Sequence, residues 1–215
     1  MVSCVTDSIA TVMVGWNMEL YQIASELGQS VDIVVDASPV CLPGNVKHYK
    51  SDLQVTRDFP KIKIIVAIDN IENRKKACEF YSDFNVEFLP LLSGFLASTS
   101  RYGQGLVMHR LSAISEQCLL GDHVRLNTGA IVTHDVSIGS YSTIAPGAVI
   151  LGKAKIGRGV YVGANSTVLG GISITDNVVI GAGAVVTKDI DQPCTVVGVP
   201  ANAVSYPKSS IFHSD

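Results

Sequence analysis

A six-residue repeat is the feature that most constrains the fold of this chain. Stepping by six from Ile114 to Val186 meets thirteen positions, and every one of them is aliphatic. If about a third of residues are aliphatic, chance agreement at thirteen sites is on the order of one in a million. Three residues after most of these positions stands a residue that tolerates a left-handed backbone: Gly129, Asp135, Gly147, Gly159, Asn165, Gly171, Asn177 and Gly183. Each unit therefore predicts one short strand and one sharp turn.

Three such units close a triangular coil of eighteen residues, with the aliphatic side chain of each unit in the interior. Successive coils then stack as parallel strands roughly 4.8 Å apart. The positions two residues before the aliphatic ones are mostly small or β-branched, which suits a narrow core. The repeat therefore predicts an all-β left-handed parallel β-helix, an exception to the usual right-handed crossover.

The composition changes near residue 103, which indicates two domains. Four of the nineteen glycines lie in residues 1–102 and fifteen lie in residues 103–215. A Gly-rich stretch full of Val, Ile and Thr is a poor helix former. We therefore predict a first domain at 1–102, a β-helix at 103–190 and a C-terminal extension at 191–215.

Strands and helices alternate in the first hundred residues. The apolar runs predict strands at Thr11–Val14, Val31–Val35, Lys63–Ile68 and Val86–Leu89, with helices over Glu19–Leu27 and residues 74–80. This pattern predicts an α/β, Rossmann-like domain with a small parallel sheet. Ligands of such sheets bind at the carboxyl ends of the strands, so the candidate acceptor-binding residues here are Gly15, Trp16, Asn17, Asp36, Asp69 and Asn70.

The nucleotide signal in this half is weak, and two alternatives stay open. There is no GxGxxG after the first strand, where a single Gly15 precedes Trp16. Asp36 either accepts hydrogen bonds from a ligand or only forms a turn. Trp16 either stacks on a ligand or packs against the protein.

Charge, hydropathy and cysteine usage exclude several classes of function. The formal net charge is −3, with no basic stripe for nucleic acid and no polybasic membrane patch. The longest apolar run, Val178–Val186, is about half of the ~20 residues that span a bilayer. No basic residue precedes the first apolar stretch, so we expect no secretory signal and a cytoplasmic protein. The five cysteines are scattered and form no metal-binding spacing, so we expect reduced thiols and no metal.

Eighteen-residue spacing aligns residues along the edges of the predicted prism. One edge, here called the His134 edge, carries Glu116, His134, Gly152, Gly170 and Lys188. Two bare glycines beside a histidine predict a groove with exposed backbone; the alternative is that the glycines only serve turns. Three coil steps from His134 to Lys188 cover about 14 Å, roughly the reach of a pantetheine arm, and leave a cation for its phosphates.

His134 and Asp135 are the main catalytic candidates. An imidazole can take up a proton at neutral pH, and a neighbouring carboxylate can fix its tautomer. Acyl transfer from a thioester requires a base for the attacking amine or hydroxyl and an N–H group for the developing oxyanion. A single exposed histidine is usually only a surface residue of a turn. Gly152 and Gly170, aligned with His134 on the same edge, favour the catalytic role instead.

The sequence resembles the hexapeptide-repeat acyltransferases. Their signature is matched by Gly181–Ile190 (GAGAVVTKDI) and by Val197–Ala201 (VGVPA). The subfamily with an N-terminal Rossmann-like domain is the most similar, and it contains bacterial nucleotide-aminosugar N-acetyltransferases and sialic acid O-acetyltransferases. Its catalytic stretch is matched by Asn127–Asp135 (NTGAIVTHD), and a further match is Ala67–Asn70 with Arg74–Lys76.

The resemblance implies acetyl-coenzyme A as donor and a homotrimer with its sites between neighbouring β-helices. It implies that His134 is the general base, that Asp135 supports it and that Asn127 lies near the acceptor. It also implies coenzyme A contacts at Thr143, Gly152, Ala164 and Ala182; the edge itself suggests Gly170 and Lys188 as further contacts.

The first domain departs from the family pattern. The loop Gly15–Glu19 lacks the family's later glycines and its histidine, and Asp69 stands where the family has glycine. A carboxylate there repels a diphosphate unless it is compensated. The favoured function is N-acetylation of a nucleotide-linked amino-deoxy sugar in glycan synthesis. The alternatives are O-acetylation of a sialic acid-like or other sugar, and a non-catalytic trimeric scaffold.

Overall fold

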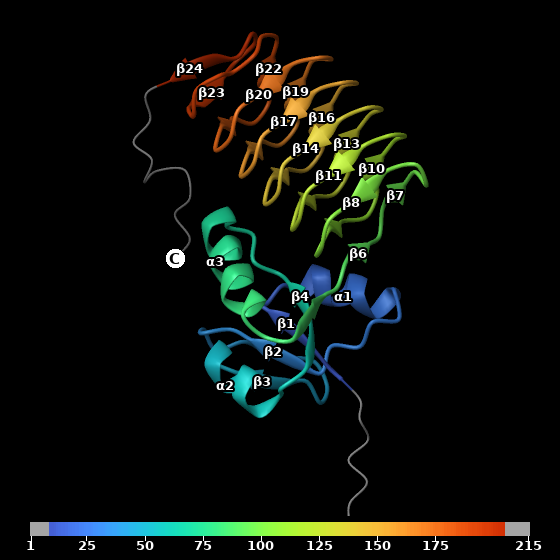
Figure 1. Ribbon diagram of the computed structural model, residues 1–215, viewed down its shortest axis with the longest axis vertical. Coiled ribbons are helices and arrows are strands. Elements are labelled where there is room, and N and C mark those ends of the chain that lie inside the picture. The colour runs from blue at the N-terminus through green and yellow to red at the C-terminus, as the bar shows by residue number, and fades with distance from the viewer. Residues whose placement is uncertain (1–8, 205–215) are drawn as a thin grey trace, which may run out of the picture. The chain divides into compact units, whose positions relative to one another are not determined.

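The structure is a computed structural model that describes residues 9–204 (Figure 1). It divides the chain into two compact units, one of Met1–Asp69 and Asn73–Leu89 and the other of Asn70–Glu72 and Pro90–Asp215. Residues 205–215 of the predicted C-terminal extension lie outside the described part.

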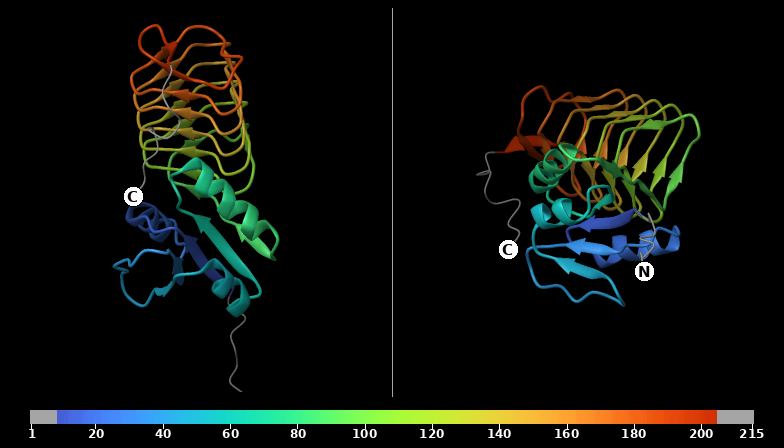
Figure 2. Two further views of the ribbon diagram at one scale, coloured as in Figure 1. Left: turned by 90° about the vertical axis from the view of Figure 1, so that its left-hand side faces the viewer. Right: turned by 60° about the horizontal axis from the view of Figure 1, so that its bottom comes forward.

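The first unit contains a five-stranded parallel sheet with helices in its connections. The strand order is β3-β2-β1-β4-β5, so the order reverses between β1 and β4. Figure 2 shows α1 and α3 on opposite faces of this sheet. The strands are β1 (Ala10–Val14), β2 (Ile33–Val35), β3 (Lys47–Tyr49), β4 (Ile62–Val66) and β5 (Val86–Phe88), and the helices are α1 (Met18–Glu26), α2 (Asp52–Asp58) and α3 (Ile71–Ser82).

The sequence predicted the central strands of this sheet and missed one edge. Four strands and two helices lie within a few residues of their expected places, and the central strands bury apolar runs such as Val12–Val14. β3 and α2 were not predicted. β3 is Lys-His-Tyr, with no buried residue, and Val55 is the only buried residue of α2, so neither carries a periodic apolar signal.

The second unit consists of stacked coils whose parallel strands form three sheets, which fits a left-handed β-helix. We name each sheet by one of its strands: the β13 sheet (β22-β19-β16-β13-β10-β7), the β14 sheet (β20-β17-β14-β11-β8) and the β12 sheet (β24-β23-β21-β18-β15-β12-β9-β6). In the β13 sheet each strand pairs with the strand eighteen residues away, as Ile114 does with Val132 and Val132 with Ile150.

Two-residue strands make up the coils. They are β6 (Leu91–Leu92), β7 (Phe95–Leu96), β8 (Arg101–Tyr102), β9 (Val107–Met108), β10 (Ala113–Ile114), β11 (Leu119–Leu120), β12 (Arg125–Leu126), β13 (Ile131–Val132), β14 (Ser137–Ile138), β15 (Thr143–Ile144), β16 (Val149–Ile150), β17 (Lys155–Ile156), β18 (Tyr161–Val162), β19 (Thr167–Val168), β20 (Ser173–Ile174), β21 (Val179–Ile180) and β22 (Val185–Val186). The longer β23 (Thr195–Val197) and β24 (Asn202–Val204) follow and pair antiparallel.

The core confirms the six-residue repeat. All thirteen aliphatic positions from Ile114 to Val186 are buried, none more than 6% exposed. Every sixth residue from Gly105 to Gly183 has a positive φ, including all eight turn residues named from the sequence. The same backbone is imposed on residues that resist it: Leu111, Gln117, His123, Tyr141 and Lys153. The coil geometry thus overrides local preference at these turns.

The coils extend beyond the repeat at both ends. The first strand of the stack is β6 at Leu91, twelve residues before the expected start at 103, and it pairs with β9. The expected end at 190 is passed by β23, which pairs with β21. The offsets at these two ends are sixteen residues instead of eighteen, so the six-residue pattern is lost although stacking continues.

Candidate active site

His134 and Asp135 form a hydrogen-bonded pair in the turn between β13 and β14. The imidazole Nδ1 lies 2.8 Å from Asp135 Oδ2, and the two side chains are 60% and 39% exposed. An ionised carboxylate only accepts hydrogen bonds, so Nδ1 carries the proton of the neutral ring. The lone pair of Nε2 is then free to accept a proton from an approaching group.

Gly152 makes room for this imidazole. A Cβ atom built on Gly152 would lie 2.7 Å from Cε1 and 2.8 Å from Nε2 of His134. The ring therefore lies against the bare backbone of the next coil, and any side chain at this position would displace it. Gly170 follows one coil further, where a Cβ would meet the carbonyl oxygen of Gly152 at 3.1 Å.

The backbone of the His134 edge offers unused hydrogen-bond donors. Within the described residues, the amide N–H groups of Gly152 and Gly170 donate no hydrogen bond. At the edge that carries Arg158, the coil above supplies side-chain acceptors instead. There the N–H of Asp122 donates to Ser140 Oγ (3.1 Å) and that of Arg158 donates to Asp176 Oδ1 (2.7 Å). The edge with Arg158 thus satisfies these amides internally, whereas the His134 edge leaves them for a ligand.

The third edge, here called the Ala164 edge, shares this property. The N–H groups of Ala164 and Ala182 also donate no hydrogen bond within residues 9–204. Asn127 lies beside this edge, half-buried, and not on the His134 edge. The residues predicted to contact coenzyme A are therefore divided between two edges of one β-helix.

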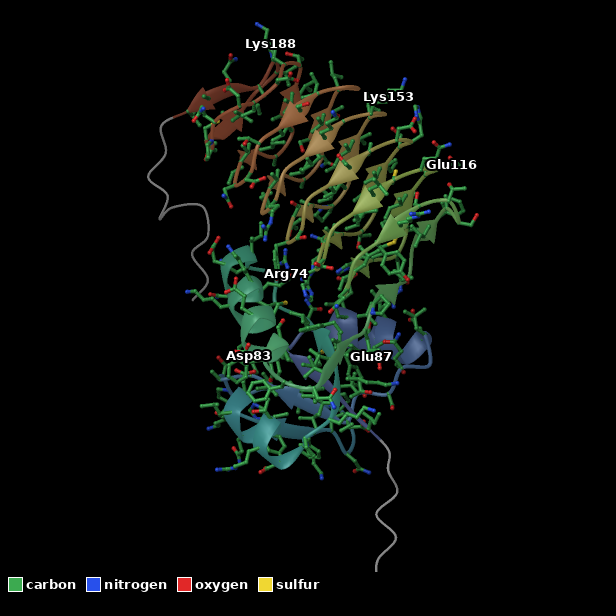
Figure 3. The ribbon with its side chains drawn as sticks, viewed as in Figure 1. Arg74, Asp83, Glu87, Glu116, Lys153 and Lys188 are labelled. Atoms are coloured by element: carbon green, nitrogen blue, oxygen red, sulfur yellow. The ribbon has the colours of Figure 1, made fainter. Side chains whose placement is uncertain are left out.

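The remaining predicted contacts differ in exposure. Lys188 is exposed on the His134 edge, where Figure 3 shows it with Glu116. Thr143 on β15 is only 3% exposed, so in this structure its side chain offers almost no surface to a ligand. Arg125, at the matching position of β12, is buried as well, at 1% exposed.

A buried thiol next to the pair was not singled out from the sequence. Cys118 Sγ donates to the carbonyl oxygen of Thr133 at 3.0 Å. Burial, with smaller contributions from Asp135 and Glu116, raises the pKa of the Cys118 thiol. Cys118 is thus a buried, protonated thiol just before β11, one coil from the catalytic pair.

Two kinds of comparison place this architecture among known proteins. Residues 117–152 and 153–188 match the model of the family described as bacterial transferase hexapeptide (six repeats). The repeat of the β-helix is therefore similar to that of the bacterial hexapeptide transferases. The matched residues run from β11 to β22 and include both His134 and Asp135.

Solved structures similar to this chain cover both of its units. PerB from Caulobacter crescentus, solved in complex with CoA and GDP-perosamine, has 25% identity and a TM-score of 0.85 over 91% of this chain and 97% of its own. The acetyltransferase domain of PglB from Neisseria gonorrhoeae has 24% identity and a TM-score of 0.84, over 91% of this chain and 98% of its own. WeeI from Acinetobacter baumannii has 19% identity and a TM-score of 0.77, over 92% of this chain and 100% of its own. Among the curated proteins, no match to the sequence was found.

In the first unit of the chain, three predicted acceptor residues have structural partners. Asp36 accepts the N–H of Trp16 at Oδ2 and that of Ser38 at Oδ1, both at 2.9 Å. Asn17 is the N-cap of α1, since its Oδ1 accepts the N–H of Leu20 at 3.0 Å. The Trp16 ring packs against Tyr21 with 5.6 Å between centroids. These contacts favour the structural interpretation of the three side chains.

The loops after β1 and β4 pack closely together. Gly15 has a φ of +80°, and a Cβ built on it would lie 2.9 Å from Ile68 Cγ1. The buried Arg74 donates from Nη1 to the carbonyl oxygens of Ile68 (3.1 Å) and Asp69 (2.8 Å). Asp69 is exposed and Asn70 is half-buried at the end of this loop. The acceptor residues predicted in the first hundred residues thus follow the carboxyl ends of β1, β2 and β4, whereas Asn127 follows β12.

The described residues contain no helix long and apolar enough to cross a membrane. Across residues 9–204 there is also no group of three or more His, Cys, Asp or Glu side chains arranged to hold a metal ion.

Proposed function

We propose that the chain is an acetyl-coenzyme A-dependent N-acetyltransferase that acts on the amine of a nucleotide-linked amino-deoxy sugar, with His134 as the general base. The observation that carries this proposal is the His134–Asp135 pair with its Nε2 over Gly152, beside unused backbone N–H groups. The likeness to PerB, which was solved with CoA and GDP-perosamine, supports the sugar and nucleotide parts.

The arrangement can perform acetyl transfer in one protonation cycle. The acceptor nitrogen attacks the thioester carbonyl carbon, a C–N bond forms and the C–S bond breaks. His134 Nε2 takes the proton that the nitrogen loses and passes it to the departing thiolate, so the products are the acetamide and the free thiol. Asp135 holds the Nδ1 proton and stabilises the imidazolium that forms meanwhile.

The donor fits the His134 edge. A pantetheine arm carries two amides, which need hydrogen-bond partners, and the N–H groups of Gly152 and Gly170 are available. Leu151 and Leu169 flank these glycines in sequence and supply apolar surface. Lys188, about 14 Å from His134 along the stack, would meet the phosphates.

A homotrimer would complete this site. The outward positions of the β13 sheet are mostly apolar, with Phe95 62% and Ile131 41% exposed. This face lies between the His134 edge and the Ala164 edge. A three-fold axis in front of it brings the His134 edge of one copy against the Ala164 edge of the next, so that Gly152 and Gly170 face Ala164, Ala182 and Asn127 of the neighbour.

In this proposal the first unit is a Rossmann-like acceptor-binding domain, and the reaction takes place in the cytoplasm. Its strand order reverses between β1 and β4, the place where such sheets bind ligands. O-acetylation of a sugar hydroxyl is the second candidate, because the same base would serve a hydroxyl. The intact His134–Asp135 pair argues against a purely structural scaffold.

Thiol release from acetyl-coenzyme A tests the proposal. The purified protein is given matched panels of amino and hydroxy sugars, free and nucleotide-linked. Release with nucleotide-linked amino sugars is expected, whereas release with hydroxy sugars alone would refute N-acetylation. His134→Ala should lower kcat at least ~100-fold, with an unchanged sedimentation coefficient. An active monomer in sedimentation would contradict the shared site.

A further inference from the structure

Lys153 is a cation on the turn directly above the catalytic pair. It follows Gly152, and its main-chain N–H donates to the carbonyl oxygen of His134 at 3.1 Å. Its side chain is exposed and has no carboxylate within ion-pair distance in the part of the chain that the structure describes. Figure 3 shows Lys153 projecting from the β-helix on the same side as Glu116 and Lys188.

The fold does not require a lysine here. Lys153 has a φ of +65°, a backbone that glycine adopts without penalty and lysine resists. The corresponding residue of the next coil is Gly171, with a φ of +75°. A glycine or asparagine would therefore suit the backbone of this turn better, so the turn does not explain the choice of a lysine.

The position of Lys153 along the stack indicates which substrate it contacts. It stands one coil, roughly 4.8 Å, from Asp135, close to the reacting atoms. The donor's phosphates would lie near Lys188, two coils further along the stack, so they are out of reach. An anion that meets Lys153 during the reaction therefore belongs to the acceptor.

We propose that Lys153 binds an anionic group of the acceptor, a phosphate or a carboxylate close to the reacting amine or hydroxyl, and so determines which sugars are acetylated. This inference rests on the proposed function, because it takes His134 as the reacting base. The other role open to Lys153 is to offset the charges of Asp135 and Glu116 on the same edge, which would act through His134 and not through the acceptor.

The test compares Lys153→Gly and Lys153→Arg with the matched control Lys155→Ser. Lys155 carries the same charge two residues away on β17, and its column neighbours are Ser137 and Ser173, so serine fits there. The acceptors are a nucleotide-linked sugar, a sugar acid with a carboxylate and a neutral sugar. Their affinities are measured by calorimetry in the presence of coenzyme A, and their KM values by thiol release.

Loss of a charge-assisted hydrogen bond predicts that Lys153→Gly weakens binding of the anionic acceptor by about 10- to 100-fold. Lys153→Arg should retain most of the affinity and Lys155→Ser all of it, with an unchanged KM for acetyl-coenzyme A. Whichever anionic acceptor is affected identifies the phosphate or the carboxylate. An equal effect on the neutral sugar, a raised KM for acetyl-coenzyme A or a shifted pH profile of kcat would overturn the inference. If the proposed function is wrong, the wild type releases no thiol with any of these acceptors. Calorimetry still reports, without turnover, whether Lys153→Gly weakens binding of an anionic sugar.

Discussion

Replacing Gly152 with alanine should inactivate the base while leaving the fold intact. The new Cβ would lie 2.7 Å from Cε1 of His134, whereas carbon atoms in contact keep about 3.5 Å apart. The imidazole must therefore move by about 0.8 Å. Gly152 does not have a left-handed φ, so alanine fits its backbone. The displaced ring is largely exposed, so the free energy of unfolding should hardly change.

This movement of the imidazole should lower kcat. A displacement of about 1 Å in a catalytic group can lower the rate on the order of 100-fold. We expect this loss in kcat for Gly152→Ala, measured by thiol release at saturating substrates. The control is Arg158→Ala, at the same turn position on another edge, which should retain full activity.

A double-mutant cycle isolates the cause. If Gly152→Ala acts only by displacing the imidazole, adding it to His134→Ala should cause no further loss of kcat. A kcat for Gly152→Ala within threefold of the wild type would refute the reasoning. An additive double mutant would show that Gly152 acts on the donor and not on His134.

Three further predictions concern strain, alkaline stability and thiol reactivity. Leu111 has a φ of +61° and is 82% exposed, so Leu111→Asn should raise the free energy of unfolding in urea by about 1 kcal/mol; a decrease would contradict strain at this turn. Burial, together with the 2.6 Å hydrogen bond to Asp52, raises the pKa of Tyr81, so its stabilising contribution is complete below the unfolded value of about 10 and is lost as the pH rises above it. Urea unfolding between about pH 8 and 11 should therefore show a steeper alkaline loss in the wild type than in Tyr81→Phe. A thiol reagent at neutral pH should label exposed Cys41 quickly and buried Cys118 only on unfolding, and Cys41→Ser should diminish the fast phase; rapid labelling of Cys118 would be the contrary result.

The fold was largely predictable because its coils repeat one physical requirement. Each coil must bury one aliphatic residue per six-residue unit, and all thirteen aliphatic residues from Ile114 to Val186 are buried. The ends were less predictable, since the strands at Leu91 and Thr195 pair with an offset of sixteen residues. β3 escaped prediction because its Lys-His-Tyr sequence buries nothing.

The part of the candidate site that follows from the eighteen-residue spacing along one edge was predictable. The part that depends on the hydrogen-bond partners of individual side chains was not. Eighteen-residue spacing brings His134 and Gly152 together, and the structure adds that the ring fills the space of the missing side chain. Asn17 caps α1 and Asp36 accepts two main-chain N–H groups, and residue type alone does not determine these hydrogen bonds. Thr143 has an outward strand position and is nevertheless buried.

From β7 to β22 each strand pairs with the strand eighteen residues away, and this offset also limits how such a chain can change in length. Inserting six residues after Asp135 would preserve every strand and turn, yet it would rotate all later residues onto the next edge and separate Lys188 from His134. Inserting eighteen residues would keep both on one edge and lengthen the distance between them by one coil, about 4.8 Å. The span between base and distal cation can therefore evolve only in whole-coil increments, and point substitutions cannot adjust it.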